Sequence, residues 1–119
     1  MTPSTIVNQR TGQSIATQVV WRRNPLTKGL GLMLRRRIAE DEAHIFVEGG
    51  ESRLNTTIHM FFVFFPIGVI WVDQAGRVVD TALAKPFRPL YVPKRPAKVF
   101  IEGHPSILAR VQVGDTLTF

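Results

Sequence analysis

The sequence contains no cysteine, and this absence excludes several kinds of site at once. Without thiols the chain has no disulfide framework, no thiolate metal site and no cysteine nucleophile. The absence does not choose a cellular compartment. A chain of 119 residues is of ordinary length for one domain, so we expect a single domain spanning residues 1–119. A chain of this size buries enough surface to form a hydrophobic core without cross-links.

Acidic residues are few: the chain has 9 Asp and Glu against 15 Lys and Arg, which gives a net charge of +6. Such a balance raises the expectation of an anionic partner. The basic residues are spread along the chain, however, and no known RNA- or DNA-binding motif is present. Weak nucleic-acid binding is therefore the last of three functional hypotheses, and we do not expect nucleic acid as the partner.

Targeting signals and catalytic motifs are also missing. The first ten residues contain no apolar core of a signal peptide, which favours a cytoplasmic protein, although an exported protein with a trimmed N-terminus would look the same. The three histidines have no metal-ligand spacing, and there is no GxSxG motif and no glycine-rich phosphate loop. We therefore predict no metal and no cofactor, and the sequence leaves the catalytic residues, if any, unknown.

The most prominent feature that is present is an uncharged stretch between Arg53 and Asp73. Its strictly apolar part, Met60–Val72, is shorter than the roughly 20 residues of a spanning helix and contains a proline, so we predict no membrane span. The abundance of Phe, Val and Ile favours two buried strands, at Ile58–Phe64 and Ile67–Val72.

Two phenylalanines within this stretch, Phe62 and Phe64, are expected in a central strand beside Trp71. Burial of each ring would stabilise the fold by about 1.5–3 kcal/mol. If these rings prove to be exposed instead, the stretch is a surface, and it becomes the leading candidate for a binding surface.

Short strands separated by turn residues dominate the rest of the chain. Asn24-Pro25 is typical of a helix start, and Asp73–Gly76 predicts the turn of a hairpin. The pattern predicts a mainly β fold, a small β-sandwich or partly closed barrel with one or two short helices. The further strands expected are Thr5–Asn8, Ile15–Trp21, Ile45–Val47, Arg77–Leu83, Lys98–Glu102 and Thr116–Phe119, with helices at Pro25–Met33 and Pro105–Ala109.

The order of several short motifs resembles the family called domain of unknown function 192. The residues that carry the resemblance are Gly31-Leu32-Met33-x-Arg35, Met60, Pro66-Ile67, Asp73, Gly76-Arg77-Val78-Val79, Pro86, Glu102 and Gly114-Asp115. The resemblance covers roughly Trp21 to Phe119 and implies a compact, mainly β fold. It implies no activity, because the family has none established. It also implies that relatives are often exported.

The chain departs from that family's pattern at three places. Phe62 and Val63 stand where the family usually has an Asn-Thr pair, and Gly68 stands where it usually has Asp. The family's Met-Leu-Phe strand reads His44-Ile45-Phe46 here. If the polar family residues serve a site, that site is altered in this chain.

Six residues are the candidates for ligand contacts, each with a structural alternative: Arg35, His59, Asp73, Phe87, Tyr91 and Glu102. Arg35 would bind an anion, pair with helix-end carbonyls, or pair with Asp73 or Glu102. His59 would titrate near neutral pH in a site, or be a hydrogen-bonded residue at a strand end. The aromatic residues of the basic, proline-rich loop would stack on a ligand or cover the rim of the core.

The leading functional hypothesis is a non-enzymatic binding or interaction module whose partner is an unidentified small molecule or protein. The second is a small enzyme of unknown reaction that uses His59, Arg35 and a carboxylate. The two differ in one observable way, because the enzyme requires these groups to converge on a shared pocket.

Overall fold

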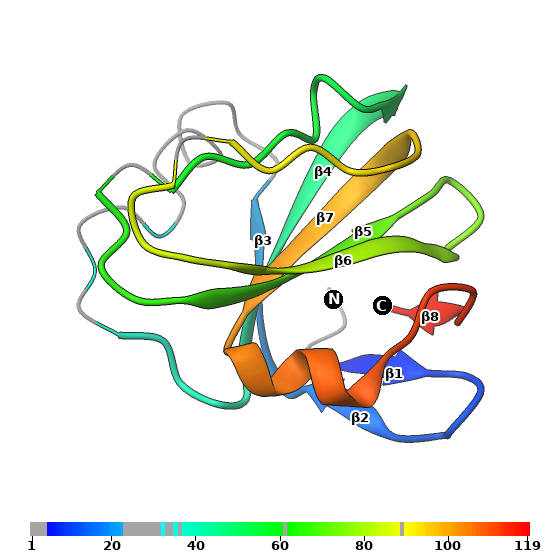
Figure 1. The fold of residues 1–119 in the computed structure, drawn as a ribbon. Coiled ribbons are helices and arrows are strands. Elements are labelled where there is room, and N and C mark those ends of the chain that lie inside the picture. The colour runs from blue at the N-terminus through cyan, green and yellow to red at the C-terminus, as the bar shows by residue number, and fades with distance from the viewer. Residues whose placement is uncertain (1–4, 23–31, 33–34, 36, 61, 89) are drawn as a thin grey trace.

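In the computed structural model, which describes residues 5–22, 32, 35, 37–60, 62–88 and 90–119, the chain forms eight strands and one short helix (Figure 1). The strands are β1 (Ile6–Asn8), β2 (Ser14–Ala16), β3 (Gln18–Arg22), β4 (Glu42–Ser52), β5 (Ile67–Val72), β6 (Val78–Ala84), β7 (Ala97–Gly103) and β8 (Leu117–Thr118). The helix η1 (Pro105–Arg110) is a 3₁₀ helix.

These strands build two sheets. A five-stranded sheet has the order β3-β4-β7-β5-β6, and a three-stranded sheet has the order β2-β1-β8. The small sheet and η1 lie together on one side of the large sheet (Figure 1). The predicted mainly β fold is confirmed, and of the two architectures expected it is the layered one, since the large sheet does not close into a barrel.

Side chains alternate between the two faces of the large sheet, so the sheet has a hydrophobic core on each side. On one face Ile45, Ile70 and Ile101 pack with residues of the small sheet and η1. On the other face Phe46 and Phe100 stack at 4.6 Å between ring centroids, and Trp71 belongs to the same core. Because β5 lies between two strands and between two cores, all six of its residues are buried.

The predicted hairpin around Asp73–Gly76 is confirmed. β5 and β6 pair antiparallel, and the Gly76 N–H donates to the carbonyl of Asp73 at 3.1 Å. Gly76 has a φ of +87°, a left-handed conformation that glycine adopts without steric cost. Ile67–Val72 is also a strand with the predicted bounds.

The prediction of a buried strand at Ile58–Phe64 is wrong. Within this segment Ile58 makes only an isolated bridge to Tyr91, and the exposed fractions of Phe62 and Phe64 are 53% and 50%. The physical reason lies in the sheet order, because β6 and β7 occupy both edges of β5 and leave no edge for the chain segment that precedes it. The core next to Trp71 is filled instead by Ile58, Met60 and Val63.

Several other predicted strands and helices are of the predicted type but have different bounds in the structure. The predicted strand Ile15–Trp21 is divided between β2 and β3, and the strand predicted at Ile45–Val47 extends over the whole of β4. The helix predicted at Pro105–Ala109 is η1. The helix predicted at Pro25–Met33 lies almost entirely outside the described residues. No helix in the described part of the chain is long and apolar enough to cross a bilayer.

Candidate functional site

A cluster of charged side chains lies at the end of the large sheet where β4 begins. Arg35 contacts Glu42 with both terminal nitrogens of its guanidinium, at 2.5 and 3.1 Å. Glu42 is the first residue of β4, and its side chain is only 13% exposed. This two-point pairing matches the planar fork of arginine to the two carboxylate oxygens, so it fixes the orientation of Glu42.

His44, two residues further along β4, is fixed by the same network. Arg22 donates from Nε to Nδ1 of His44 at 3.1 Å. A guanidinium N–H is always a donor, so Nδ1 is an acceptor and the ring proton of neutral His44 lies on Nε2. This Nε2–H then donates to Oε2 of Glu42 at 2.5 Å. Burial lowers the pKa of His44, which keeps the ring neutral at neutral pH.

Glu102 faces this network from the neighbouring strand. It pairs with His44 across β4 and β7, so the two side chains share one face of the sheet. Glu102 is only 8% exposed, and within the described residues no side chain donates a hydrogen bond to it. Burial raises the pKa of Glu102 to about 8, and the positive charge of Arg22 opposes this shift only in part.

The charges of the cluster do not cancel at neutral pH. The Arg35 guanidinium, with help from His44, lowers the pKa of Glu42 to about 2, so Glu42 is ionised. His44 is neutral, and Glu102 is mainly protonated below a pKa of about 8. Two guanidinium groups, those of Arg22 and Arg35, are therefore balanced by one carboxylate. The cluster has a surplus positive charge and a buried carboxylic acid proton.

A small cavity of about 240 Å³ is lined by residues that are close in sequence to the cluster. It is lined by Arg37, Ile38, Phe65, Pro66, His104 and Pro105. Two of these residues, Arg37 and His104, lie two positions beyond Arg35 and Glu102 respectively. The cavity is slightly smaller than the roughly 300–1,000 Å³ of typical ligand pockets, so it has room for a small ligand.

Of the six residues predicted from the sequence, Arg35 and Glu102 contribute to this cluster. The direct pairing of Arg35 with Asp73 or Glu102 considered from the sequence is wrong, because its carboxylate partner is Glu42. His59 is exposed in the segment that leads to Met60, and the histidine that Arg35 approaches is His44, at 3.1 Å from Nε2.

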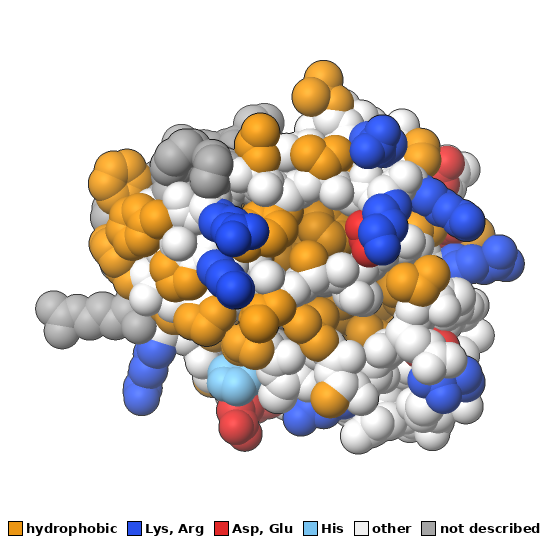
Figure 2. Space-filling model, in the orientation of Figure 1, with side chains coloured by type: hydrophobic (Ala, Val, Ile, Leu, Met, Phe, Trp, Pro, Cys, Tyr) orange, Lys and Arg blue, Asp and Glu red, His pale blue; other side chains and the backbone are white. Residues whose placement is uncertain are grey.

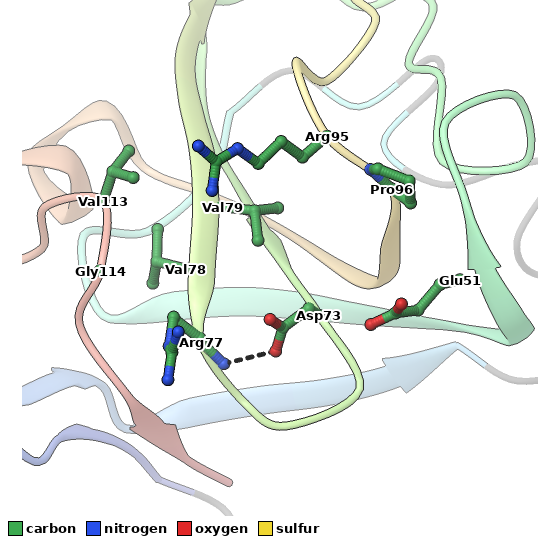
Figure 3. Close-up of a pocket in the computed structure, with 9 residues that line it drawn as sticks. All are labelled: Glu51, Asp73, Arg77, Val78, Val79, Arg95, Pro96, Val113 and Gly114. Carbon is green, nitrogen blue, oxygen red and sulfur yellow. Dashed lines mark hydrogen bonds between the residues drawn. The ribbon is translucent and has the colours of Figure 1, made fainter.

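Asp73 lies in a different, shallow pocket of about 370 Å³ (Figure 3). Its Oδ1 accepts hydrogen bonds from the backbone N–H groups of Ala75 and Arg77, both at 2.9 Å, so the side chain stabilises the β5–β6 turn. Arg95 and Glu51 extend over the same pocket from other segments (Figure 3). Because the pocket is open and Asp73 has a clear structural role, it is a weaker candidate for a site.

Tyr91 and Phe87 belong to the loop between β6 and β7 and have opposite roles. Tyr91 packs against the core beside Ile58, and its hydroxyl oxygen accepts a hydrogen bond from the Lys85 N–H at 2.8 Å. Phe87 is 49% exposed and contacts the rings of Phe62 and Phe64, with centroids 6.3 and 5.4 Å away. We call these three residues, Phe62, Phe64 and Phe87, the phenylalanine surface.

Sequence reasoning missed Arg22, Glu42 and His44. One local signal was available, since Glu42, His44 and Phe46 alternate along a strand and therefore point to the same face. The pairing of that strand with the one containing Glu102 joins positions that are 58 residues apart, His44 and Glu102, and no local pattern reports it. Among the described residues no group of three His, Asp or Glu side chains is placed to hold a metal ion.

The fold places this chain in the class of compact, two-sheet β proteins, and a charged cluster lies at one end of its larger sheet. Crystal structures of two proteins share this fold. One is a protein of unknown function from Novosphingobium aromaticivorans (TM-score 0.83, 21% identity, 97% of this chain and 84% of that one). The other is described as a putative transcription regulator from Sinorhizobium meliloti (TM-score 0.83, 20% identity, 96% and 89%).

The family follows from sequence comparison. The family model of domain of unknown function 192 (DUF192), described as an uncharacterized ACR, matches residues 6–119. A UPF0127 protein of Thermococcus kodakarensis is 37% identical over 96% of this chain and 72% of its own length. A UPF0127 protein of Pyrococcus furiosus is 38% identical over 94% of this chain and 95% of its own. The chain therefore belongs to the DUF192 family, as the sequence motifs indicated.

Proposed function

We propose that this protein is a binding module for a small oxyanion, a carboxylate or a phosphate, that contacts the cluster around Arg22 and Glu102. The observation that carries the proposal is a buried carboxylic acid, Glu102, on the same face as a network with surplus positive charge. A protonated carboxyl group and a guanidinium are both hydrogen-bond donors, and an oxyanion accepts from both.

The remaining members of the cluster fit a supporting role. Both terminal nitrogens of Arg35 donate hydrogen bonds to Glu42, and this pair orients His44. His44 in turn holds the Nε of Arg22. This chain of contacts positions the Arg22 guanidinium on the sheet face that carries Glu102, which lowers the entropy lost when a ligand binds.

The proposal is tested by NMR titration of the ¹⁵N-labelled protein with acetate and with inorganic phosphate, at pH values below and above the pKa of Glu102. We expect the amides around Glu102 and His44 to shift, with affinity falling above pH 8 as Glu102 loses its proton. Arg22→Gln should weaken binding about tenfold or more. Arg77→Gln, which removes a guanidinium from the separate pocket of Figure 3, is the matched control.

Two results would contradict the proposal: no shift of these amides with either anion at millimolar concentration, or an equal loss of affinity in Arg22→Gln and Arg77→Gln. The Glu102→Gln variant adds a second criterion. Its amide still donates a hydrogen bond but does not titrate, so its affinity for acetate, which stays ionised throughout this range, should not depend on pH between 6 and 9. Acetate and phosphate, compared at one pH, distinguish the two kinds of oxyanion.

An acid-catalysed reaction is the second candidate function, favoured by the retained proton of Glu102. It differs from the sequence hypothesis in its histidine, because His44 rather than His59 lies beside Arg35. Hydrolysis of p-nitrophenyl esters and phosphates tests it: turnover that is lost in Glu102→Gln and falls above pH 8 would support an enzyme. Absence of turnover in the parent protein would remove this candidate.

A further inference from the structure

The phenylalanine surface is unusual in two independent respects, the exposure of its rings and the backbone conformation of two of its residues. Phe62, Phe64 and Phe87 are each about half exposed, at 53%, 50% and 49%, although a large aromatic ring contributes most to stability when buried. In addition, Phe62 and Phe87 have φ angles of +58° and +62°, and they are the non-glycine residues with positive φ in the described part of the chain. A bulky residue in this left-handed region is strained.

Phe62 combines both features. A bulky aromatic residue tolerates the left-handed region poorly, whereas asparagine or glycine adopts it readily. Phenylalanine at this position therefore gives neither a favourable backbone conformation nor full burial of its ring. Strain that burial does not offset points to a function for the ring.

Two backbone hydrogen bonds hold the surface together. The Phe87 N–H donates to the carbonyl of Met60 at 2.9 Å, and the Met60 N–H donates to the carbonyl of Arg88 at 3.0 Å. Met60 itself is fully buried. The rings are thus presented from two segments that are joined to each other and anchored in the core, which makes the surface a built feature of the fold.

The charged residues in the two segments that supply the rings are basic. Lys85 and Arg88, on either side of Phe87, are exposed. The two segments that supply the rings lie in stretches without acidic residues, since residues 54–72 and 81–101 contain neither Asp nor Glu. Figure 2 shows hydrophobic side chains gathered at the side of the molecule where β5 begins and β6 ends in Figure 1, with Lys and Arg side chains next to them.

We propose that the phenylalanine surface docks this protein onto an anionic lipid bilayer, with the three rings inserted at the level of the headgroups and Lys85 and Arg88 contacting lipid phosphates. Exposed aromatic rings beside cations, without carboxylates, are the composition of surfaces that bind peripherally to membranes. Protein interfaces are also enriched in Phe and Arg, but Lys is depleted there, and Lys85 is one of the two cations beside the rings. Such docking requires no spanning helix. It uses residues separate from the charged cluster on β4 and β7, so it does not depend on the proposed oxyanion site.

The test is co-sedimentation with two kinds of vesicle, one of phosphatidylcholine alone and one of phosphatidylcholine mixed with phosphatidylglycerol. We expect the parent protein to bind the anionic vesicles, less so as salt is raised, and to bind neutral vesicles more weakly. Phe62→Asn and Phe87→Asn should each weaken binding about tenfold through the lost apolar contact. Lys85→Gln and Arg88→Gln should weaken binding to the anionic vesicles alone.

Val113→Asn is the matched control. Val113 is 57% exposed, but it lies near the start of β6, whereas Phe87 follows the end of that strand. This variant should bind vesicles as the parent does. If a Phe→Asn variant does not fold, as judged by circular dichroism, Phe64→Ser provides the same test without altering a residue of positive φ.

Three outcomes would overturn the proposal. The first is no binding of the parent protein to either kind of vesicle at low salt. The second is equal vesicle binding by the Phe62→Asn, Phe87→Asn and Val113→Asn variants. The third is unchanged vesicle binding by the phenylalanine variants together with loss of a protein that co-purifies with the parent, which would assign the surface to a protein partner.

Discussion

His44 and Glu102 lie directly opposite each other on β4 and β7, and the two buried side chains have pKa shifts of opposite direction. Burial is the largest cause of both shifts, because it disfavours the imidazolium of His44 and the carboxylate of Glu102 alike. The pair is therefore neutral at neutral pH. This relationship makes the stability of the protein depend on pH in a specific way.

The first prediction concerns Glu102. Its pKa is about 8 in the folded state and near 4.5 in the unfolded chain, so its contribution to stability is complete below pH 4.5 and is lost as pH rises through 8. The loss should approach about 1.4 kcal/mol per pH unit between pH 6.5 and 8, because below pH 6.5 the lowered pKa of His44 contributes a slope of the opposite sign. Urea unfolding measured between pH 6.5 and 9 checks it. Glu102→Gln should remove this slope, and a parent protein with flat stability from pH 6.5 to 8 would contradict the assignment.

The second prediction concerns the opposite end of the pH scale. Glu42 has a pKa of about 2 in the folded state, below its usual 4.5, so its contribution is present above pH 4.5 and is lost as pH falls through 2. Because Arg35 is 38% exposed, solvent weakens the pair, and Glu42→Gln should cost only about 1–2 kcal/mol at neutral pH. Urea unfolding at pH 7 and pH 3 should show that the variant loses less stability in acid than the parent.

A control belongs with this second experiment. Asp115 also has a pKa of about 2, because Arg10 pairs with it. Some acid dependence should therefore remain in Glu42→Gln and disappear when Asp115→Asn is added. An acid slope that Glu42→Gln leaves unchanged would show that the Arg35 pair is not formed in solution.

The third prediction separates buried from exposed phenylalanines. Phe46→Ala should cost about 3–5 kcal/mol, because Phe46 is buried and stacked on Phe100. Phe62→Asn should be neutral or should stabilise the protein by up to about 1 kcal/mol, since it relieves the left-handed strain and exposes little new surface. Thermal unfolding of the two variants checks both statements. A Phe62→Asn variant as unstable as Phe46→Ala would mean that the ring is buried after all.

The fourth prediction concerns Gly68 on β5. A Cβ atom added there would lie 2.9 Å from Cγ1 of Ile107 and 3.1 Å from the carbonyl oxygen of His104, so η1 packs where a side chain would need space. Gly68→Ala should therefore cost about 1–3 kcal/mol and Gly68→Asp more.

A double-mutant cycle provides the measurement for Gly68. Ile107→Ala removes the atoms in closest contact, so Gly68→Ala should be less destabilising in that background than in the parent. Equal costs in the two backgrounds, measured by urea unfolding, would show that the contact with η1 does not explain the glycine.

The sequence by itself determined the elements whose causes are local. The Asp73–Gly76 turn, the strand Ile67–Val72 and the helical turn after Pro105 each follow from residues next to one another in the chain, and the structure contains all three. The family membership was likewise readable from ordered short motifs. Glu102 was identified as a candidate site residue because an acid within a β-rich segment needs a partner if buried, and Arg35 because a guanidinium binds anions or carboxylates.

Only the tertiary structure decided where the phenylalanines and the charged partners lie. Phe62 and Phe64 have the composition of a core strand, yet β6 and β7 already occupy both edges of β5, so those rings are exposed. The pairing of Glu42 with Arg35, and of His44 with Glu102, depends on sheet register between distant segments. The hydrophobicity of a side chain determines how much its burial would stabilise the fold. The competition between segments for the edges of a sheet determines which of these side chains become buried.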